Sequence, residues 1–81
     1  MFYTYVLKSL LNGKRYAGYT SKDPRLRLCE HNSGANTWTR ANKPFELVYF
    51  EEYLDKTEAI KRELFLKSGQ GRKFLDDILN I

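Results

Sequence analysis

The stretch YTYVLKSLLNGKRYAGYT, residues 3–20, predicts a β-hairpin near the start of the chain. Its centre, Asn12-Gly13, is a strong short-range signal for a tight turn between antiparallel strands. Aromatic and β-branched residues are frequent on both sides of the turn, and they favour extended backbone. We therefore expect strands over residues 3–9 and 14–20.

The register of this hairpin determines which side chains share a face, because facing residues of an antiparallel pair project to the same side. A two-residue turn places Tyr5, Tyr16 and Gly18 on one face, with the tyrosines about 13 Å apart at the usual rise per residue. A four-residue turn would bring the two tyrosines opposite each other. Gly18 leaves a gap beside Tyr16 where a ligand backbone could approach. The ordinary alternative is that the tyrosines pack in a core and the glycine marks a bulge.

A helix is expected over residues 24–32, because Asp23 before Pro24 is typical of a helix start and Ser33-Gly34 of a helix end. Leu26 and Cys29 are three residues apart and are expected to face the core.

The rest of the chain predicts four further segments from its breakers, caps and apolar spacing. These are a loop over residues 33–44, a strand from Phe45 to about Tyr53, a helix from Glu58 to Lys67 capped by Asp55 or Thr57, and, after a connection at Gln70-Gly71, a helix from Arg72 to Leu79.

Length and composition indicate one globular domain over residues 1–81, with 42% hydrophobic and 30% charged residues. No apolar run approaches the roughly 20 residues that cross a bilayer, and the N-terminus does not resemble a secretory signal. Cys29 is the only cysteine, which excludes an internal disulfide and argues against a thiolate metal site. A reducing cytoplasm is the expected compartment.

The charge of the chain, +4 overall, is unevenly distributed. Residues 1–45 hold eight basic and two acidic side chains, whereas residues 46–81 hold six basic and eight acidic ones. A basic half beside an acidic half suggests a polyanionic partner on one side of the molecule. The alternative is that the charges provide solubility alone.

Two sets of polar residues break local rules. Ile60 and Leu64 mark an apolar stripe on which Glu63 also falls, and a carboxylate there is costly unless it is paired or binds a cation. The alternative is a glutamate at the edge of the stripe, reaching water.

Arg27 and His31 lie four residues apart on one face of the expected helix over residues 24–32. They could bind and deprotonate a ligand together, unless that face is simply solvated.

These positions together resemble the GIY-YIG nuclease family, and the resemblance covers nearly the whole chain. Tyr3-Thr4-Tyr5 and Tyr16-Ala17-Gly18 stand where the two triplets of that motif belong, and the other three elements follow in order as Arg27, His31 and Glu63. Tyr3 replaces the glycine of the first triplet, and Ala17 replaces the isoleucine of the second. The sequence texture is similar to the small stand-alone bacterial members of the family.

The resemblance implies an α+β fold, with a three-stranded antiparallel sheet flanked by about three helices in the order strand–strand–helix–strand–helix–helix. It also implies hydrolysis of nucleic-acid phosphodiesters, DNA rather than RNA, in a repair or recombination setting. Glu63 would hold one Mg²⁺ or Mn²⁺, and Arg27 would stabilise phosphate oxygens. Tyr5 and His31 would share the deprotonation of water, either as partners or with His31 as the base, and Tyr16 would position water or phosphate.

Nucleic acid, most simply DNA, is therefore the expected partner, and no membrane contact is expected. Basic residues of the N-terminal half are candidates for contacts with the nucleic-acid backbone: Lys14, Arg15, Arg40 and Lys43. Without an appended DNA-binding domain, a protein partner could supply substrate recognition. The alternative function is a module of the same fold that binds nucleic acid or protein without cleavage.

Overall fold

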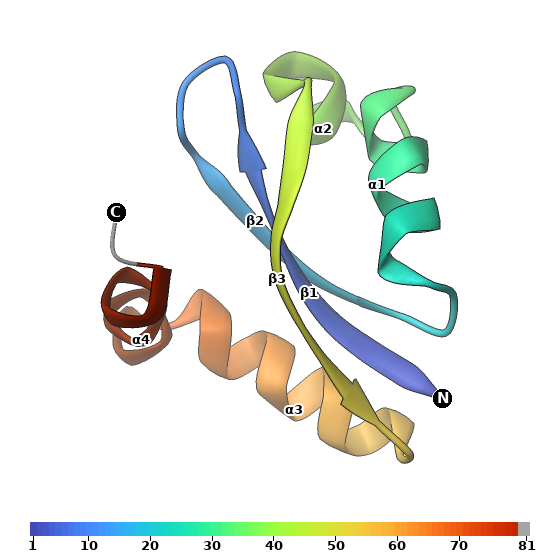
Figure 1. Cartoon of the computed structure of the whole chain (residues 1–81), viewed down its shortest axis with the longest axis vertical. Helices are drawn as coiled ribbons and strands as arrows, with labels where there is room; N and C mark the ends of the chain where they lie inside the picture. Colours follow the sequence, from blue (N-terminus) through green and yellow to red (C-terminus); the bar gives the residue numbers. More distant parts are fainter. Residues whose placement is uncertain (80–81) are drawn as a thin grey trace.

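A three-stranded antiparallel sheet in the order β2-β1-β3 forms the centre of the computed structural model, which describes residues 1–79 (Figure 1). The elements follow the predicted order, with one additional helix, and confirm the α+β fold. Along the chain they are β1 (Phe2–Ser9), β2 (Arg15–Thr20), α1 (Pro24–Asn32), α2 (Thr37–Asn42), β3 (Phe45–Tyr53), α3 (Lys56–Lys67) and α4 (Gly69–Leu79).

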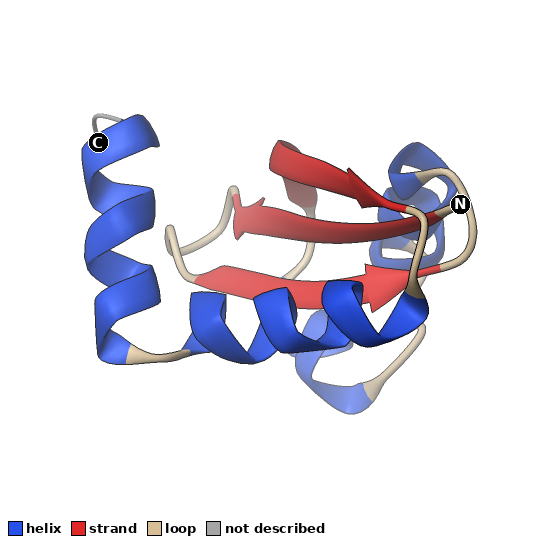
Figure 2. Ribbon diagram, turned by 90° about the horizontal axis from the view of Figure 1, so that it is seen from below, coloured by secondary structure: helices blue, strands red, loops and turns tan. Residues whose placement is uncertain are grey.

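Helices cover both faces of the sheet, so each face has its own core. On the α3 and α4 side, Val6 and Ala17 pack with Leu66 and Leu75. The other side is covered by α1 and α2, and its core is built from Tyr5, Leu7, Phe45, Tyr16, Leu28 and Leu47. Strand β2 is at one edge of the sheet, and α4 lies crosswise to α3 (Figure 2).

The turn between β1 and β2 has four residues, because the Ser9 amide donates to the Lys14 carbonyl at 2.8 Å. Tyr5 therefore pairs with Gly18, and Leu7 pairs with Tyr16. The shared face of the two tyrosines and the four-residue alternative for the turn are confirmed, but the separation of about 13 Å and the directly opposite placement are both wrong. The tyrosines are diagonal neighbours, with ring centroids 6.5 Å apart.

The loop predicted over residues 33–44 is wrong in part, because it contains α2. Asn36 caps this helix: its side chain accepts from the Thr39 amide at 2.8 Å, while the Thr39 hydroxyl accepts from the Asn36 amide at 3.2 Å. This reciprocal capping box satisfies two backbone donors at the helix start. The connection predicted at Gln70-Gly71 is also wrong, since both residues belong to α4.

Helix α1 presents a different face to the core from the one expected. Leu26 is 57% exposed and Cys29 is exposed, whereas His31 is fully buried and Leu28 packs against the sheet. Asn32 at the helix end bonds both backbone groups of Phe45, at 2.7 and 3.2 Å. This clamp joins α1 to the start of β3.

Helix α3 begins two residues earlier than predicted, with Asp55 rather than Thr57 as its N-cap. The expected stripe is also misplaced, because Leu64 is 63% exposed. The buried residues of α3 are Ala59 and Leu66, four before and three after Glu63. Glu63 therefore does lie on the inner face, as predicted, but with different neighbours.

Within residues 1–79, no helix combines the length and the apolar character that crossing a membrane requires.

Candidate nuclease active site

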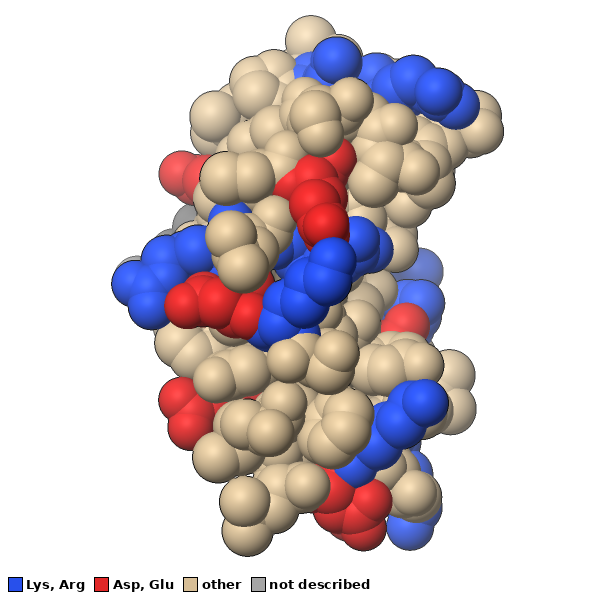
Figure 3. Space-filling view, turned by 90° about the vertical axis from the view of Figure 1, so that its right-hand side faces the viewer, with Lys and Arg blue, Asp and Glu red and all other residues tan. Residues whose placement is uncertain are grey.

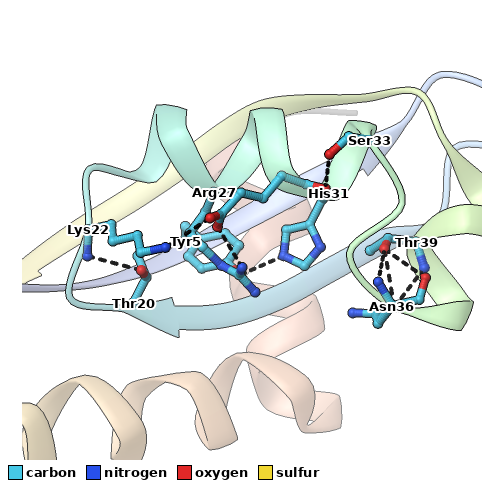
Figure 4. A network of polar contacts seen from close by, with 9 residues as sticks. Tyr5, Thr20, Lys22, Arg27, His31, Ser33, Asn36 and Thr39 are labelled. Atoms are coloured by element: carbon cyan, nitrogen blue, oxygen red, sulfur yellow. Dashed lines mark hydrogen bonds and ion pairs between the residues drawn. The ribbon is translucent and has the colours of Figure 1, made fainter.

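Tyr5 and His31 form the centre of the candidate site. The Tyr5 hydroxyl and His31 Nε2 are 2.9 Å apart, and both residues are buried. Tyr5 comes from β1 and His31 from α1, so a strand and the helix covering it supply one group each (Figure 4). Nδ1 of His31 is buried without a hydrogen-bond partner among the described residues.

Gly18 makes room for the Tyr5 side chain to lie across β2. A Cβ atom at Gly18 would be 2.6 Å from the Tyr5 hydroxyl oxygen, which is shorter than real contacts allow. The space beside Gly18, where we expected a ligand backbone to approach, is therefore occupied by the side chain of Tyr5. The Tyr5 hydroxyl thus reaches toward the β2 edge of the sheet.

Arg27 lies beside this pair and is held by Glu30. The Arg27 guanidinium and the Glu30 carboxylate are 2.7 Å apart, and Lys22 reaches the same carboxylate at 2.8 Å. Hydrogen bonds from Lys22 and then Arg27 lower the pKa of Glu30 to about 2. Burial raises the pKa of Tyr5, and the adjacent Arg27 guanidinium opposes that rise.

Tyr16 completes an aromatic group around His31. Its ring centroid is 4.9 Å from that of His31 and 5.4 Å from that of Trp38, which in turn stacks on Phe45 at 5.7 Å. Aromatic pairs at these separations add stability beyond the area they bury. Trp38 from α2 thus supports the Tyr16 ring from the outer side of the site.

Glu63 belongs to α3, in the layer opposite α1 and α2. Helix α3 packs on the other face of the sheet, where the Thr4 hydroxyl donates to the Ala59 carbonyl at 2.7 Å. The negative charge of Glu63 makes the smallest contribution to the raised pKa of Tyr5, after burial and Tyr16. Glu63 is paired with Lys67 at 2.7 Å, and 15% of its side chain is exposed.

The donor chemistry at Glu63 suits a hard divalent cation. Within residues 1–79, no group of three or more His, Cys, Asp or Glu side chains could hold a metal ion. Mg²⁺, however, is commonly bound by one or two carboxylates together with water and substrate phosphates. A single carboxylate such as Glu63 therefore fits a cation that would be bound jointly by protein and substrate.

The four basic residues predicted to contact the nucleic-acid backbone differ in how exposed and how free of ion pairs they are. Lys14, Arg40 and Lys43 are exposed, but Arg15 pairs with Asp76 at 2.7 Å and is largely buried. The hairpin and α2 lie at one end of the molecule, where Asn12 donates to Asn42 at 2.7 Å. Figure 3, seen from the α1 side, shows Lys and Arg atoms at this end and mixed charges at mid-height.

Sequence reasoning missed three partners of the site residues. Glu30 holds Arg27, Lys67 pairs with Glu63, and Trp38 stacks on Tyr16. The first two could have been found, because oppositely charged residues three or four apart are neighbours on a helix. The place of Trp38 depends on α2, and that helix falls within the segment predicted to be a loop.

Comparison with known proteins identifies the family of the chain. The model of the GIY-YIG catalytic domain matches residues 1–74, so the chain belongs to the GIY-YIG family. It is 44% identical to a UPF0213 protein of Bacillus pumilus over 72 residues, covering 88% of this chain and 71% of that protein. A UPF0213 protein of Streptococcus pneumoniae is 44% identical over 79 residues, covering 93% and 78%.

A solved structure shows the same architecture. The solution NMR structure of the UPF0213 protein BH0048 from Bacillus halodurans has a TM-score of 0.57 and 33% sequence identity to this chain. The match covers 96% of this chain and 85% of that one.

The pH dependence of stability follows from the buried histidine. Burial, and then the positive charge of Arg27, lower the pKa of His31 below its ordinary 6.5. Below pH 6.5 the unfolded chain therefore binds a proton that the folded protein excludes. The free energy of unfolding consequently decreases as the pH is lowered. We expect the free energy of unfolding from urea titrations to decrease from about pH 7 to about pH 5.5, above the range in which the carboxylates titrate. His31 is the only histidine, so His31→Gln should remove this decrease; an unchanged slope would contradict the assignment.

Proposed function

We propose that the chain is a metal-dependent endonuclease that hydrolyses nucleic-acid phosphodiesters. The observation that carries the proposal is the Tyr5–His31 hydrogen bond, with Arg27 beside it. A general base, a phosphate-binding cation and an anionic metal ligand are the parts that such a hydrolysis needs. Family membership supports the same reaction class.

In the proposed mechanism, Tyr5 and His31 act as one base. The raised pKa of Tyr5 makes its phenolate scarce near neutral pH, so its proton needs an acceptor. His31 is neutral there because its pKa is lowered, and Nε2 accepts if the ring proton is on Nδ1. Water transfers its proton to the Tyr5 oxygen while the phenolic proton moves to His31. The hydroxide oxygen attacks phosphorus, and the bond from phosphorus to the leaving oxygen breaks.

The other residues bind the phosphate. Arg27 would donate to its equatorial oxygens, and its partner Glu30 fixes the guanidinium orientation. Tyr16 would orient the water or phosphate from its position beside His31. Glu63 would bind Mg²⁺ or Mn²⁺, which supplies positive charge that stabilises the phosphate and the leaving oxygen.

DNA is the proposed substrate, in preference to RNA, and repair or recombination is the proposed setting. A separate protein could direct the domain to its substrate. The direct test is incubation of the pure protein with labelled duplex, single-stranded and branched substrates, each with Mg²⁺, Mn²⁺ or EDTA. Cleavage that requires the metal is expected with at least one substrate. Failure with all of them would remove the enzymatic proposal for the isolated chain.

A second candidate function is a module that binds nucleic acid without cleaving it. One observation favours it: the single candidate metal ligand, Glu63, is already paired with Lys67 at 2.7 Å. Binding without cleavage in the substrate test would select this function.

Arg27 and Arg25 form a matched pair for testing the phosphate-binding role. Both are on α1, but Arg25 is exposed and pairs with Asp23 at 3.3 Å, away from Tyr5. Arg27→Ala should lower the cleavage rate on the order of 10²-fold, as removal of a transition-state donor does. It should also weaken substrate binding, whereas Arg25→Ala should change cleavage less than about threefold. Single-turnover rates would measure both; equal losses would contradict the assignment of Arg27.

A further inference from the structure

An open groove of about 730 Å³ lies between the hairpin end of β2 and the helices α3 and α4. The floor of the groove is apolar. It is formed by core residues of the sheet face that α3 and α4 cover: Val6, Ala17, Leu66 and Leu75. Four basic side chains line it: Lys14, Arg15, Lys67 and Arg72. None of the five candidate catalytic residues lines the groove, so it is separate from the site described above.

Nearby carboxylates neutralise only two of the four basic side chains that line the groove. Arg15 pairs with Asp76, and Lys67 with Glu63, each at 2.7 Å. Lys14 and Arg72 form no ion pair within residues 1–79. Two unpaired cations therefore lie along one groove, where they attract an anion.

A buried donor in the same place also lacks an acceptor. Arg15 donates through Nη2 to Asp76, but its Nη1 is buried and has no hydrogen-bond partner among the described residues. An unpaired buried donor is costly, and more so when it carries charge. Arg15 also lines the groove, and guanidinium and ammonium groups together suit the oxygens of a phosphate.

The groove adjoins the candidate active site at two points. Lys67 lines the groove and pairs with Glu63, the candidate metal ligand. Trp38 also lines the groove and stacks on Tyr16. A strand with its scissile phosphate near Tyr16 and Glu63 would therefore continue into the groove along the β2 edge.

We propose that this groove binds the backbone of a single nucleic-acid strand flanking the cleaved bond, with a phosphate at Arg15, Lys14 and Arg72. The inference rests on the proposed function and adds to it a binding site for a single strand beside the cleaved bond. A volume of this size is typical of a pocket for one small ligand, so it accommodates one or two nucleotides. The exposed edge of Trp38 would contact sugar or base.

Arg72 and Lys73 provide the test, because they are adjacent on α4 and both exposed, while only Arg72 lines the groove. Binding of a fluorescein-labelled 12-nucleotide single strand is measured by anisotropy, in EDTA and at several salt concentrations. Arg72→Ala should raise the Kd about tenfold, the scale of one charge-assisted hydrogen bond. It should also lower the salt slope by about 0.7, the value for one phosphate contact on a single strand. Arg72→Lys should retain most of the slope.

Lys73→Ala removes the same charge outside the groove and should leave Kd within about twofold of wild type. An effect of Lys73→Ala equal to that of Arg72→Ala, or no effect of either, would overturn the subsite. Circular dichroism verifies that each variant is folded. Because EDTA prevents metal-dependent cleavage, the result is independent of the nuclease proposal. An Arg72 effect without cleavage in the substrate test supports the groove alone, whereas cleavage without an Arg72 effect supports the nuclease alone.

Discussion

Gly71→Ala is expected to destabilise the fold by about 3 kcal/mol or more, the upper end of the range for overpacking. A Cβ atom at Gly71 would be 1.9 Å from the Phe65 carbonyl oxygen and 2.5 Å from the Leu66 Cα. Both are backbone atoms of α3, so no side-chain rotation relieves the clash, and α4 would have to move away. In a domain of this size, such a loss lowers the melting temperature by roughly 12–24 °C.

Gly69 provides the matched control, since it is in the same helix and a Cβ atom there would have no neighbour within 4 Å. Gly69→Ala should be neutral or stabilising by up to about 1 kcal/mol, because alanine restricts the unfolded chain. Thermal melts followed by circular dichroism would measure both variants. Equal melting temperatures for Gly71→Ala and wild type would contradict the close packing of α4 on α3.

Much of the fold was predictable from local sequence signals. The strands begin within one residue of the predicted positions, and α1 has the predicted bounds, because Asp23-Pro24 and Ser33-Gly34 are strong local signals. The hairpin register was not predictable in the same way. The Asn12-Gly13 pair indicates a turn but does not fix how many residues it contains. The four-residue loop depends instead on contacts with α2, such as the bond from the Ser9 hydroxyl to the Asn42 carbonyl at 2.6 Å.

The candidate site was predictable as a set of residues but not as an arrangement. Family resemblance and helical spacing selected Arg27, His31 and Glu63 one by one. Their relation depends on long-range packing: His31 meets Tyr5 from 26 positions away in sequence, and Glu63 approaches from the opposite layer. Helical periodicity did not identify the buried face of α3. Apolar residues occur on both faces of this helix, so Leu64 is exposed although Ala59 and Leu66 are buried.

Glu63→Gln is expected to have the largest effect on activity. Glutamine keeps the size of the side chain but removes the anionic oxygen that a divalent cation prefers. Loss of metal-ion charge stabilisation, worth several kcal/mol, corresponds to a rate decrease on the order of 10³-fold. Folding should be retained, because glutamine keeps the volume of the side chain and its amide oxygen can still accept the hydrogen bond from Lys67. Nucleic-acid binding in EDTA should hold or tighten, because a negative charge near the phosphates is removed.

Glu58 is the matched control on α3: it is exposed, and its nearest cation, Lys61, is 3.8 Å away. Glu58→Gln makes the same chemical change outside the candidate site and should leave the cleavage rate within about twofold of wild type.

The most direct test of the nuclease proposal is the single-turnover cleavage rate of wild type, Glu63→Gln and Glu58→Gln, on the substrate that binds best and with Mn²⁺ present. We expect cleavage by wild type and Glu58→Gln and its loss in Glu63→Gln, with all three proteins folded and binding nucleic acid. Equal rates for Glu63→Gln and wild type would contradict the proposal, because the cleavage would then not depend on the candidate metal ligand.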